Sequence, residues 1–354
     1  MTAGRAPGRS MGHEEAHFVD LGGPHPLGGS AGVLAGRGAV IYRVAIMTDE
    51  TGWHTRQLQA ALRARGAVGR CLDLADCRID TQHAWHGLVL PGYGTQLPDA
   101  VLVRGIAGGS FERVTKRLGV LHALREFGVP VYNDARAIER SVDKSMTSLL
   151  LHAAGVPTPA TWALESAEDA QRLVMRESAA GRCLVLKPLF GSQGKGLLRV
   201  GCVDGEHVPL PPLRALYGDF AYLQRYVAAQ DARGSAGHDW RVLVVGGRAV
   251  AAMRRVSEHW VHNVAQGARC EPQSLIDGPG PELVQRAVAA ARALDMDYAG
   301  VDLLPSPDGI QVIEVNGVAA WQGLQRVTRF NIAGALVNDL LDRKLAGQAA
   351  QRRA

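Results

Sequence analysis

The alternation of apolar and polar residues divides the chain into two regions of different architecture. From residue 41 onward, short apolar runs such as 41–47 and 100–104 alternate with segments whose apolar residues recur every three or four positions, such as 112–127. Strands that alternate with helices are typical of a parallel α/β sheet. The pattern therefore predicts a small α/β domain over residues 41–137.

The second region begins with a helix that we expect over residues 140–154, because this segment is followed by Gly155 and Pro157, as helices commonly are. Strand-like runs then follow one another closely, at 183–187, 197–200, 221–227, 240–245 and 249–254. Turns such as Gly246-Gly247 separate them, which favours antiparallel pairing. Helical spacing returns at 282–294 and 332–344, so the pattern indicates an α+β fold.

The first 40 residues fit neither region. They are rich in Gly, Pro and His and contain no continuous apolar segment, which is not typical of a secretory signal. We interpret them as a flexible extension or as the product of a start codon placed too early. The expected organisation is an extension at 1–40, an α/β domain at 41–137, a second domain at 138–345 with a mostly antiparallel lid subdomain at about 158–223, and a tail at 346–354.

Composition narrows the class of protein. Hydrophobic residues make up 47% and charged residues 21% of the chain, as in an ordinary globular protein, and no apolar run approaches the roughly 20 residues that cross a bilayer. The five cysteines form no CxxC pair, which predicts reduced thiols in a cytoplasmic protein. The net charge of +5 comes from arginines scattered among acids, which favours small anionic ligands and no nucleic-acid or membrane partner.

Two apolar strands near the C-terminus carry the strongest candidate site. They lie on either side of a turn centred on Asp308, which places Asp302 opposite Glu314. Glu314 and Asn316 are two residues apart and therefore share a face of their strand. Two carboxylates and an amide on one face suit Mg²⁺, which also takes phosphate oxygens and water. A solvated hairpin face is the alternative, but polar groups in so apolar a hairpin need a partner.

A glycine-rich turn follows the apolar strand that ends at Lys187. Gly191, Gly194 and Gly196 would let backbone N–H groups approach phosphate oxygens, and the lysine adds positive charge. The turn is not a Walker A loop, because Gly196 stands where Ser or Thr is required and a strand follows instead of a helix. A structural turn explains the glycines equally well, whereas a lysine that closes an apolar strand needs a counter-charge.

Several further motifs occur in a specific order along the chain. They are Asp143-Lys144, Val185-Leu186-Lys187-Pro188, Gly191-Ser192-Gln193-Gly194-Lys195-Gly196, Gln224-Arg225-Tyr226-Val227, Asp239-Trp240-Arg241, Met253-Arg254-Arg255, Asn263, Gly300-Val301-Asp302 and Glu314-Val315-Asn316. Each motif is weak alone, but the ordered set resembles the ATP-grasp ligases over roughly residues 41–345. Within that superfamily the sequence is most similar to RimK-type α-L-glutamate ligases and glutathione synthases.

The resemblance implies an ATP-grasp fold and a role for each motif. Metal binding of one or two Mg²⁺ or Mn²⁺ ions is implied for Asp302, Glu314 and Asn316. ATP binding is implied for Lys144 and Lys187, for the lid loop Gly191, Ser192, Gln193, Gly194, Lys195 and Gly196, for the adenine hinge Gln224, Arg225, Tyr226 and Val227, and for Asp239. Contacts with the acyl phosphate and the acceptor are implied for Arg241, Arg254 and Asn263, and a substrate anchor for Arg104. Surface salt bridges are the alternative for Arg241 and Arg254.

The implied reaction activates a carboxylate as an acyl phosphate, which an amine then attacks. We expect an amino acid, glutamate above all, as the amine and a small molecule or coenzyme, such as a pterin-type cofactor, as the acceptor. The alternatives are a ribosomal-protein ligase, a dipeptide or glutathione-type ligase, and a non-catalytic ATP-binding regulator. The oligomeric state stays open, with a homo-oligomer as one option.

Two positions depart from the related ligases. Arg225 occupies a hinge position where they usually carry an acid, which suggests that backbone groups alone contact the nucleotide there. Residues 317–324 replace a Pro-containing segment of the ligases that modify ribosomal protein, which weakens the case for that acceptor. Within this segment, Trp321 either packs on a flat substrate ring or fills the core.

Overall fold

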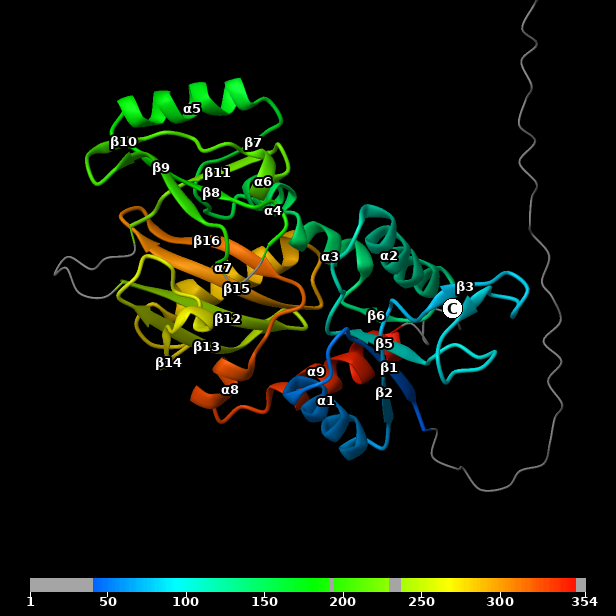
Figure 1. Cartoon of the computed structure of the whole chain (residues 1–354). Coiled ribbons are helices and arrows are strands. Elements are labelled where there is room, and N and C mark those ends of the chain that lie inside the picture. The colour runs from blue at the N-terminus through cyan, green and yellow to red at the C-terminus, as the bar shows by residue number, and fades with distance from the viewer. Residues whose placement is uncertain (1–40, 192–193, 229–236, 348–354) are drawn as a thin grey trace, which may run out of the picture. The chain divides into compact units, whose positions relative to one another are not determined.

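A four-stranded parallel sheet forms the N-terminal region, as the apolar runs predict (Figure 1). The computed structural model describes residues 41–191, 194–228 and 237–347. In spatial order the sheet contains β2 (Val68–Leu72), β1 (Arg43–Met47), β5 (Ala100–Val103) and β6 (Val131–Tyr132). A short antiparallel pair, β3 (Arg78–Ile79) and β4 (Leu88–Val89), follows β2 in the chain.

Helices cover both faces of this sheet, which explains why β5 is apolar along its whole length. The helices α1 (Trp53–Ala64) and α9 (Ile332–Asn338) share one apolar core with Val44 and Ile46 of β1. On the other face, α2 (Phe111–Glu126) shares a second core with the neighbouring β1 residues. The helix α9, from the C-terminal part of the chain, therefore completes the core of the first sheet.

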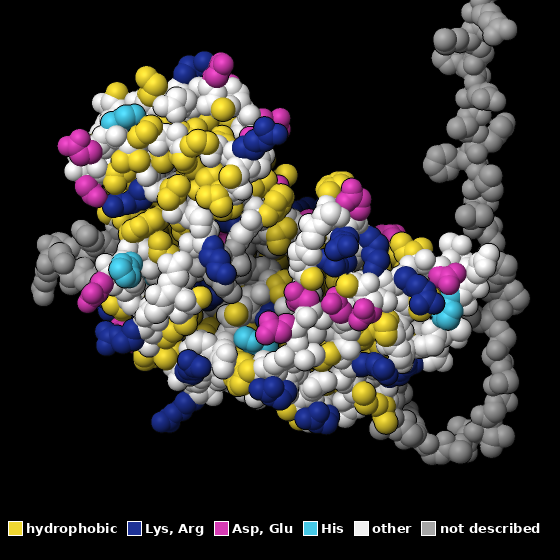
Figure 2. Space-filling model, viewed as in Figure 1, with side chains coloured by type: hydrophobic (Ala, Val, Ile, Leu, Met, Phe, Trp, Pro, Cys, Tyr) yellow, Lys and Arg dark blue, Asp and Glu magenta, His cyan; other side chains and the backbone are white. Residues whose placement is uncertain are grey.

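The second sheet is antiparallel and lies within the segment expected to form a lid, and we call it the lid sheet. Its strands, in spatial order, are β10 (Glu206–Val208), β9 (Leu198–Val203), β8 (Cys183–Lys187), β11 (Ala221–Arg225) and β7 (Thr161–Leu164). The helix α5 (Ala167–Ala179) packs against it, and the short helix α6 (Arg214–Tyr217) precedes β11. In Figure 2, apolar side chains gather on this lobe, whereas charges of both signs are spread over the rest of the visible face.

The third sheet contains the predicted hairpin, and we call it the C-terminal sheet. Its strands, in spatial order, are β14 (Arg269–Gln273), β13 (Arg248–Ser257), β12 (Gly237–Val245), β15 (Tyr298–Ser306) and β16 (Gly309–Asn316). The helix α7 (Gly280–Ala293) packs on one face. The short helix α8 (Gln322–Val327) follows β16, and a π-helical turn (Asp339–Leu345) extends α9.

The single helix expected over residues 140–154 is replaced by two helices in the structure. In place of a continuous helix over 140–154, α3 (Ala135–Val142) ends and α4 (Lys144–Ala153) begins at Asp143. The Asp143 carboxylate accepts hydrogen bonds from the backbone N–H groups of Ser145 and Met146, so it caps the N-terminus of α4. The break puts Lys144 in the first turn of a new helix.

A single buried amide joins the first sheet to the C-terminal sheet. Asn133 follows β6 and is completely buried. Its Nδ2 donates to the carbonyl oxygens of Tyr298 and Gly317, at 2.7 and 2.6 Å. Its Oδ1 accepts from the backbone N–H groups of Asp297 and Tyr298, at 2.7 and 3.0 Å. Both donors and both acceptor positions of the amide are therefore used.

We predict that Asn133→Ala lowers the free energy of unfolding by at least about 3 kcal/mol, because it leaves several buried backbone groups without partners. Urea unfolding followed by circular dichroism measures this loss. Asn338→Ala is the matched control, because Asn338 is exposed and surface substitutions cost within about 0.5 kcal/mol. Equal stability of the two variants would contradict the structural role of Asn133.

Candidate active site

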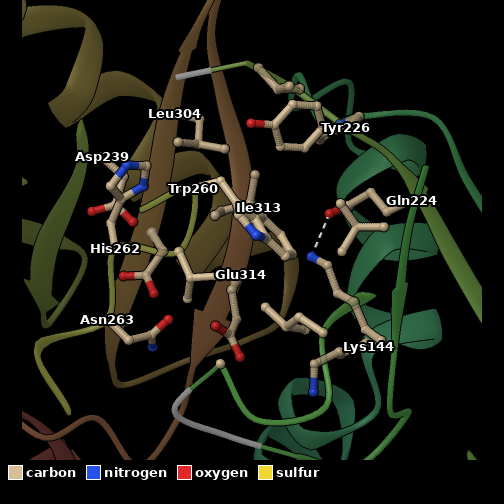
Figure 3. Close-up of a pocket in the computed structure, with 18 of the residues that line it drawn as sticks. Lys144, Gln224, Tyr226, Asp239, Trp260, His262, Asn263, Leu304, Ile313 and Glu314 are labelled. Carbon is tan, nitrogen blue, oxygen red and sulfur yellow. Dashed lines mark hydrogen bonds between the residues drawn. The ribbon is translucent and has the colours of Figure 1, made fainter. Parts of the chain in front are cut away.

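A cleft between the lid sheet and the C-terminal sheet brings together most of the predicted site residues (Figure 3). Its lining includes Lys144, Val185, Lys187, Gly191, Gly194, Lys195, Leu197, Gln224, Arg225, Tyr226, Val227, Asp239, Arg255, Trp260, Val261, His262, Asn263, Asp302, Leu304, Ile313 and Glu314. Figure 3 shows Lys144 and Gln224 on one side and Asp239, His262 and Asn263 on the other. The cleft has an apolar end near Tyr226 and a charged end near Glu314.

Two lysines reach the charged end from the lid side. Lys187, at the end of β8, donates from Nζ to Oε1 of the buried Gln224 at 2.6 Å. Burial lowers the pKa of Lys187 to about 8, although Glu314 acts in the opposite direction. Burial also lowers the pKa of Lys144, whose Nζ donates to the Gly191 carbonyl oxygen at 2.8 Å. Both ammonium groups are therefore partly desolvated and suited to bind an anionic ligand.

The hairpin pairs Asp302 with Glu314 as the sequence predicts, although its turn is centred between Pro307 and Asp308 instead of on Asp308, because a bulge between Asp302 and Leu303 shifts the register by one residue. Asp302 of β15 pairs with Glu314 of β16, and Asn316 pairs with Gly300. A bulge follows this pair, so Ile313 also faces the cleft. The Asn316 side chain donates to the Gly300 carbonyl oxygen at 3.4 Å and does not line the cleft.

Asp302 lies at the centre of a buried ionic network. Its two carboxylate oxygens accept from Nε and Nη2 of Arg241, both at 2.6 Å. Arg255 approaches the same carboxylate to 3.2 Å. Burial raises the pKa of Asp302, but the two guanidinium groups outweigh this effect and hold the pKa below its ordinary value. The carboxylate is therefore ionised.

Arg255 lines the cleft, although the sequence gave the catalytic role to its neighbour Arg254. It is buried and donates to both oxygens of Asp239, at 2.7 and 2.5 Å. Burial nevertheless raises the pKa of Asp239 to about 6. The neighbouring Arg254 points to the opposite face of β13, because successive side chains of a strand alternate. It lies 3.6 Å from Glu271 and does not line the cleft, in contrast to its expected catalytic placement.

The donor set at the charged end fits a hard divalent cation that shares its coordination sphere with a ligand. Within the described part of the chain, no cluster of three His, Cys, Asp or Glu side chains is arranged to enclose a metal. Asp302 and Glu314 nevertheless present two carboxylates from paired positions. Mg²⁺ is commonly held by one or two carboxylates together with substrate phosphates and water, so these residues are compatible with it.

Comparisons with known proteins agree with this geometry. The sequence profile of the RimK-like ATP-grasp domain matches residues 141–340, and that of the RimK pre-ATP-grasp domain matches residues 42–138. The chain belongs to the RimK-like ATP-grasp family. It is therefore an ATP-dependent carboxylate–amine ligase, and the site is expected to use ATP and Mg²⁺.

Curated relatives and solved structures support the family assignment. The tetrahydromethanopterin:alpha-L-glutamate ligase of Methanocaldococcus jannaschii is 33% identical over 69% of this chain and 79% of its own length. A probable alpha-L-glutamate ligase of Thioalkalivibrio sulfidiphilus is 30% identical over 84% of this chain and 94% of its own length. The ATP-grasp ligase PsnB, solved with a minimal precursor, Mg and ADP, shares the fold, with a TM-score of 0.61 and 23% identity over 86% of this chain and 96% of its own.

The glycine-rich loop of this ATP-grasp ligase touches the opposite wall of the cleft. Gly194 has a positive φ of 69°, and a Cβ there would lie 2.7 Å from Val261 and 2.8 Å from Asn263. Only glycine allows this approach. Ser192 and Gln193 lie outside the described residues, and Lys195 and Gly196 are exposed.

The hinge side chain Arg225 is directed away from the cleft. Its guanidinium donates to the buried Glu177 of α5 at 2.8 Å and lies 5.8 Å from the Trp162 ring centroid. It therefore anchors the hinge to the lid sheet and its helix, which explains how a basic residue can occupy this position.

Arg104 and Trp321 lie outside the cleft lining, at the junction between the first sheet and the segment after β16. Arg104 donates to the Ala319 carbonyl oxygen at 3.0 Å. Trp321 is 1% exposed and packs edge-on against Trp53 and His54, so it belongs to the core. Its backbone N–H donates to Nε2 of His54, whose pKa burial and Arg104 lower to about 4. The core alternative for Trp321 is therefore the one that the structure supports.

We predict that the stability of the nucleotide-free protein rises with pH through a contribution from Lys187. Its pKa is about 8 in the folded chain and 10.5 without burial, so above about pH 8 the unfolded chain binds more protons. The free energy of unfolding should therefore rise by about 1–2 kcal/mol between about pH 7.5 and pH 9.5. Lys187→Met should lose this rise in urea titrations, whereas the exposed-site variant Lys195→Met should keep it. A rise of the same size in Lys187→Met would refute the assignment.

We also predict that turnover depends on Arg255 and hardly at all on the adjacent Arg254. Arg255→Lys should lower kcat at least about 100-fold, because one ammonium cannot replace a fork that binds a carboxylate bidentately. Arg254→Ala should stay within about threefold of the wild type, as expected of a partly exposed side chain with one distant ion pair. ADP release measures both, with circular dichroism as the check on folding. A larger loss of kcat in Arg254→Ala than in Arg255→Lys would instead place Arg254 in the active site.

Proposed function

We propose that this ligase joins L-glutamate to a carboxylate of a pterin-type coenzyme, with ATP bound in the cleft between the lid sheet and the C-terminal sheet. The main support is the similarity to ligases named for tetrahydromethanopterin, at 33%, 34% and 29% identity in three methanogens. The absence of proline from residues 317–324 agrees with an acceptor other than ribosomal protein.

The charged end of the cleft is the proposed place for the phosphates. Lys144 and Lys187 approach it from the lid side, and their lost solvation is recovered when they bind an anion. Magnesium would neutralise phosphate charge there, with Glu314 and Asp302 as carboxylate ligands. The amide oxygen of the neighbouring Asn316 would be a further ligand. Manganese would substitute in the same donor set, and one or two ions are compatible with two carboxylates.

Arginines on the C-terminal sheet are proposed to stabilise the activated acceptor. Phosphoryl transfer to a carboxylate gives an acyl phosphate, and the amine of glutamate then displaces phosphate to form the amide. Arg255 lines the cleft, and Arg241 is held beside it by Asp302. Their fixed guanidinium groups suit the negative charge that develops in both steps. Asn263, on the same wall, would donate to the transferred phosphate.

The acceptor is proposed to enter from the side of the first sheet. Arg104 directly follows β5 there, and its guanidinium already contacts the segment that follows β16. A substrate carboxylate would find a bidentate donor at this position. This assignment gives Arg104 a role in acceptor binding and none in nucleotide binding.

The decisive experiment supplies purified protein with Mg·ATP, L-glutamate and a reduced pterin that carries a carboxylate side chain, such as tetrahydrofolate monoglutamate. We expect ADP release that requires both the pterin and glutamate, and a product heavier by one glutamyl residue in mass spectrometry. Tetrahydrobiopterin, which has no carboxylate, should give no product. Glu314→Gln should abolish turnover, because it removes a charged metal ligand.

Other results would identify the alternatives. Product formation with peptide or amino acid acceptors and none with the pterin would favour a dipeptide or glutathione-type ligase. Binding of Mg·ATP without turnover across a broad pool of carboxylic acids and amines would favour a regulator. Either result would overturn the proposed substrate.

A further inference from the structure

Two aromatic rings meet at the apolar end of the cleft, and one of them belongs to none of the motifs that the sequence singled out. Tyr226 directly follows β11 of the lid sheet, and Trp260 lies in the loop after β13 of the C-terminal sheet. Their ring centroids are 6.0 Å apart, and the ring planes meet at 79°. The contact therefore spans the cleft from one sheet to the other.

Arg199 of β9 contacts both rings of this pair. Its guanidinium carbon lies 5.6 Å from the centroid of Tyr226 and 5.9 Å from that of Trp260. Its Nη2 donates to Asp204 at 2.9 Å, which fixes the guanidinium in place. A cation at this distance from two rings is attracted by both π-systems. The loop that carries Trp260 is thus held to the lid sheet by side-chain contacts.

The walls around these rings form an apolar slot. Val185 and Leu197 belong to the lid side, and Leu304 and Ile313 come from the C-terminal sheet. Figure 3 shows Trp260 and Ile313 between Tyr226 and Glu314, so the slot runs directly into the charged end. A ligand with a flat ring at one end and phosphates at the other matches this sequence of surfaces.

We propose that Trp260 is a nucleotide-binding residue that contacts the base. Its indole covers the purine base on the side of the C-terminal sheet, so the nucleoside part of ATP contributes to binding together with the phosphates. Base–aromatic stacking gains free energy with any purine or pyrimidine, because every base has a π-face. The inference rests on the position of ATP that the proposed function assigns to this cleft.

The test compares the binding of two probes by isothermal titration calorimetry. We expect Trp260→Ala to weaken the binding of Mg·ATP by about tenfold or more, as the loss of one stacked ring does. Trp260→Phe should stay within about threefold, because it keeps an aromatic face. Mg·tripolyphosphate, which has no base, should bind the wild type and Trp260→Ala equally. Trp85→Ala is the matched control, since Trp85 is 80% exposed.

Two outcomes would overturn the inference and leave the proposed function intact. The first is wild-type affinity of Trp260→Ala for Mg·ATP. The second is an equal loss of affinity for Mg·ATP and Mg·tripolyphosphate, which would mean that Trp260 shapes the whole cleft and does not act on the base. If the wild-type protein bound no Mg·ATP, the failure would lie with the proposed nucleotide site itself.

Discussion

The Asn133 amide is the constraint on which the position of the active-site hairpin depends. It contacts the backbone where β15 begins and where the chain leaves β16, so both ends of the hairpin are tied to the first sheet by one side chain. All of these groups are buried, and an amide is the only neutral side chain that can donate twice and accept twice in this place. Asp302 and Glu314 lie between the two fixed ends. Asn133 therefore sets where the hairpin lies against the first sheet, and the pairing of β15 with β16 sets the separation of Asp302 and Glu314.

The charged residues on the two sides of the cleft differ in how they are paired. Lys144 and Lys187 are desolvated on one side, and Asp302 is fully paired with arginines on the other. The arginines and the aspartate compensate one another, whereas neither lysine forms an ion pair with any of the residues that the structure describes. Buried charges are costly unless they are paired, so the lysines lower the stability of the protein and increase its affinity for anions. The unpaired cations of the cleft therefore come from β8 of the lid sheet and from α4, whereas the paired arginines lie on the C-terminal sheet.

Periodicity and motif order predicted most of the fold, because strands with apolar faces leave a strong signal. The alternation of strands and helices predicted the parallel sheet, and the turn at Asp308 predicted the pairing of Asp302 with Glu314. The break at Asp143 was missed because local helix spacing continues through it, and the extended backbone and capping hydrogen bonds of Asp143 are visible only in the structure. The choice between Arg254 and Arg255 was beyond the sequence, because two adjacent arginines differ only in the face of β13 to which they point.

The face to which Arg255 points can be deduced from the pairing of β12 with β13. Asp239 and Arg241 flank Trp240, and Trp240 belongs to the core that α7 covers. Strand alternation then puts both polar residues on the opposite face, toward the cleft. Arg255 pairs directly with Asp239 in the adjacent strand, so it must share that face, and a buried carboxylate in this position requires such a cation. The buried acid therefore identifies its arginine once the register is known, and register is a property of two strands that neither sequence segment carries alone.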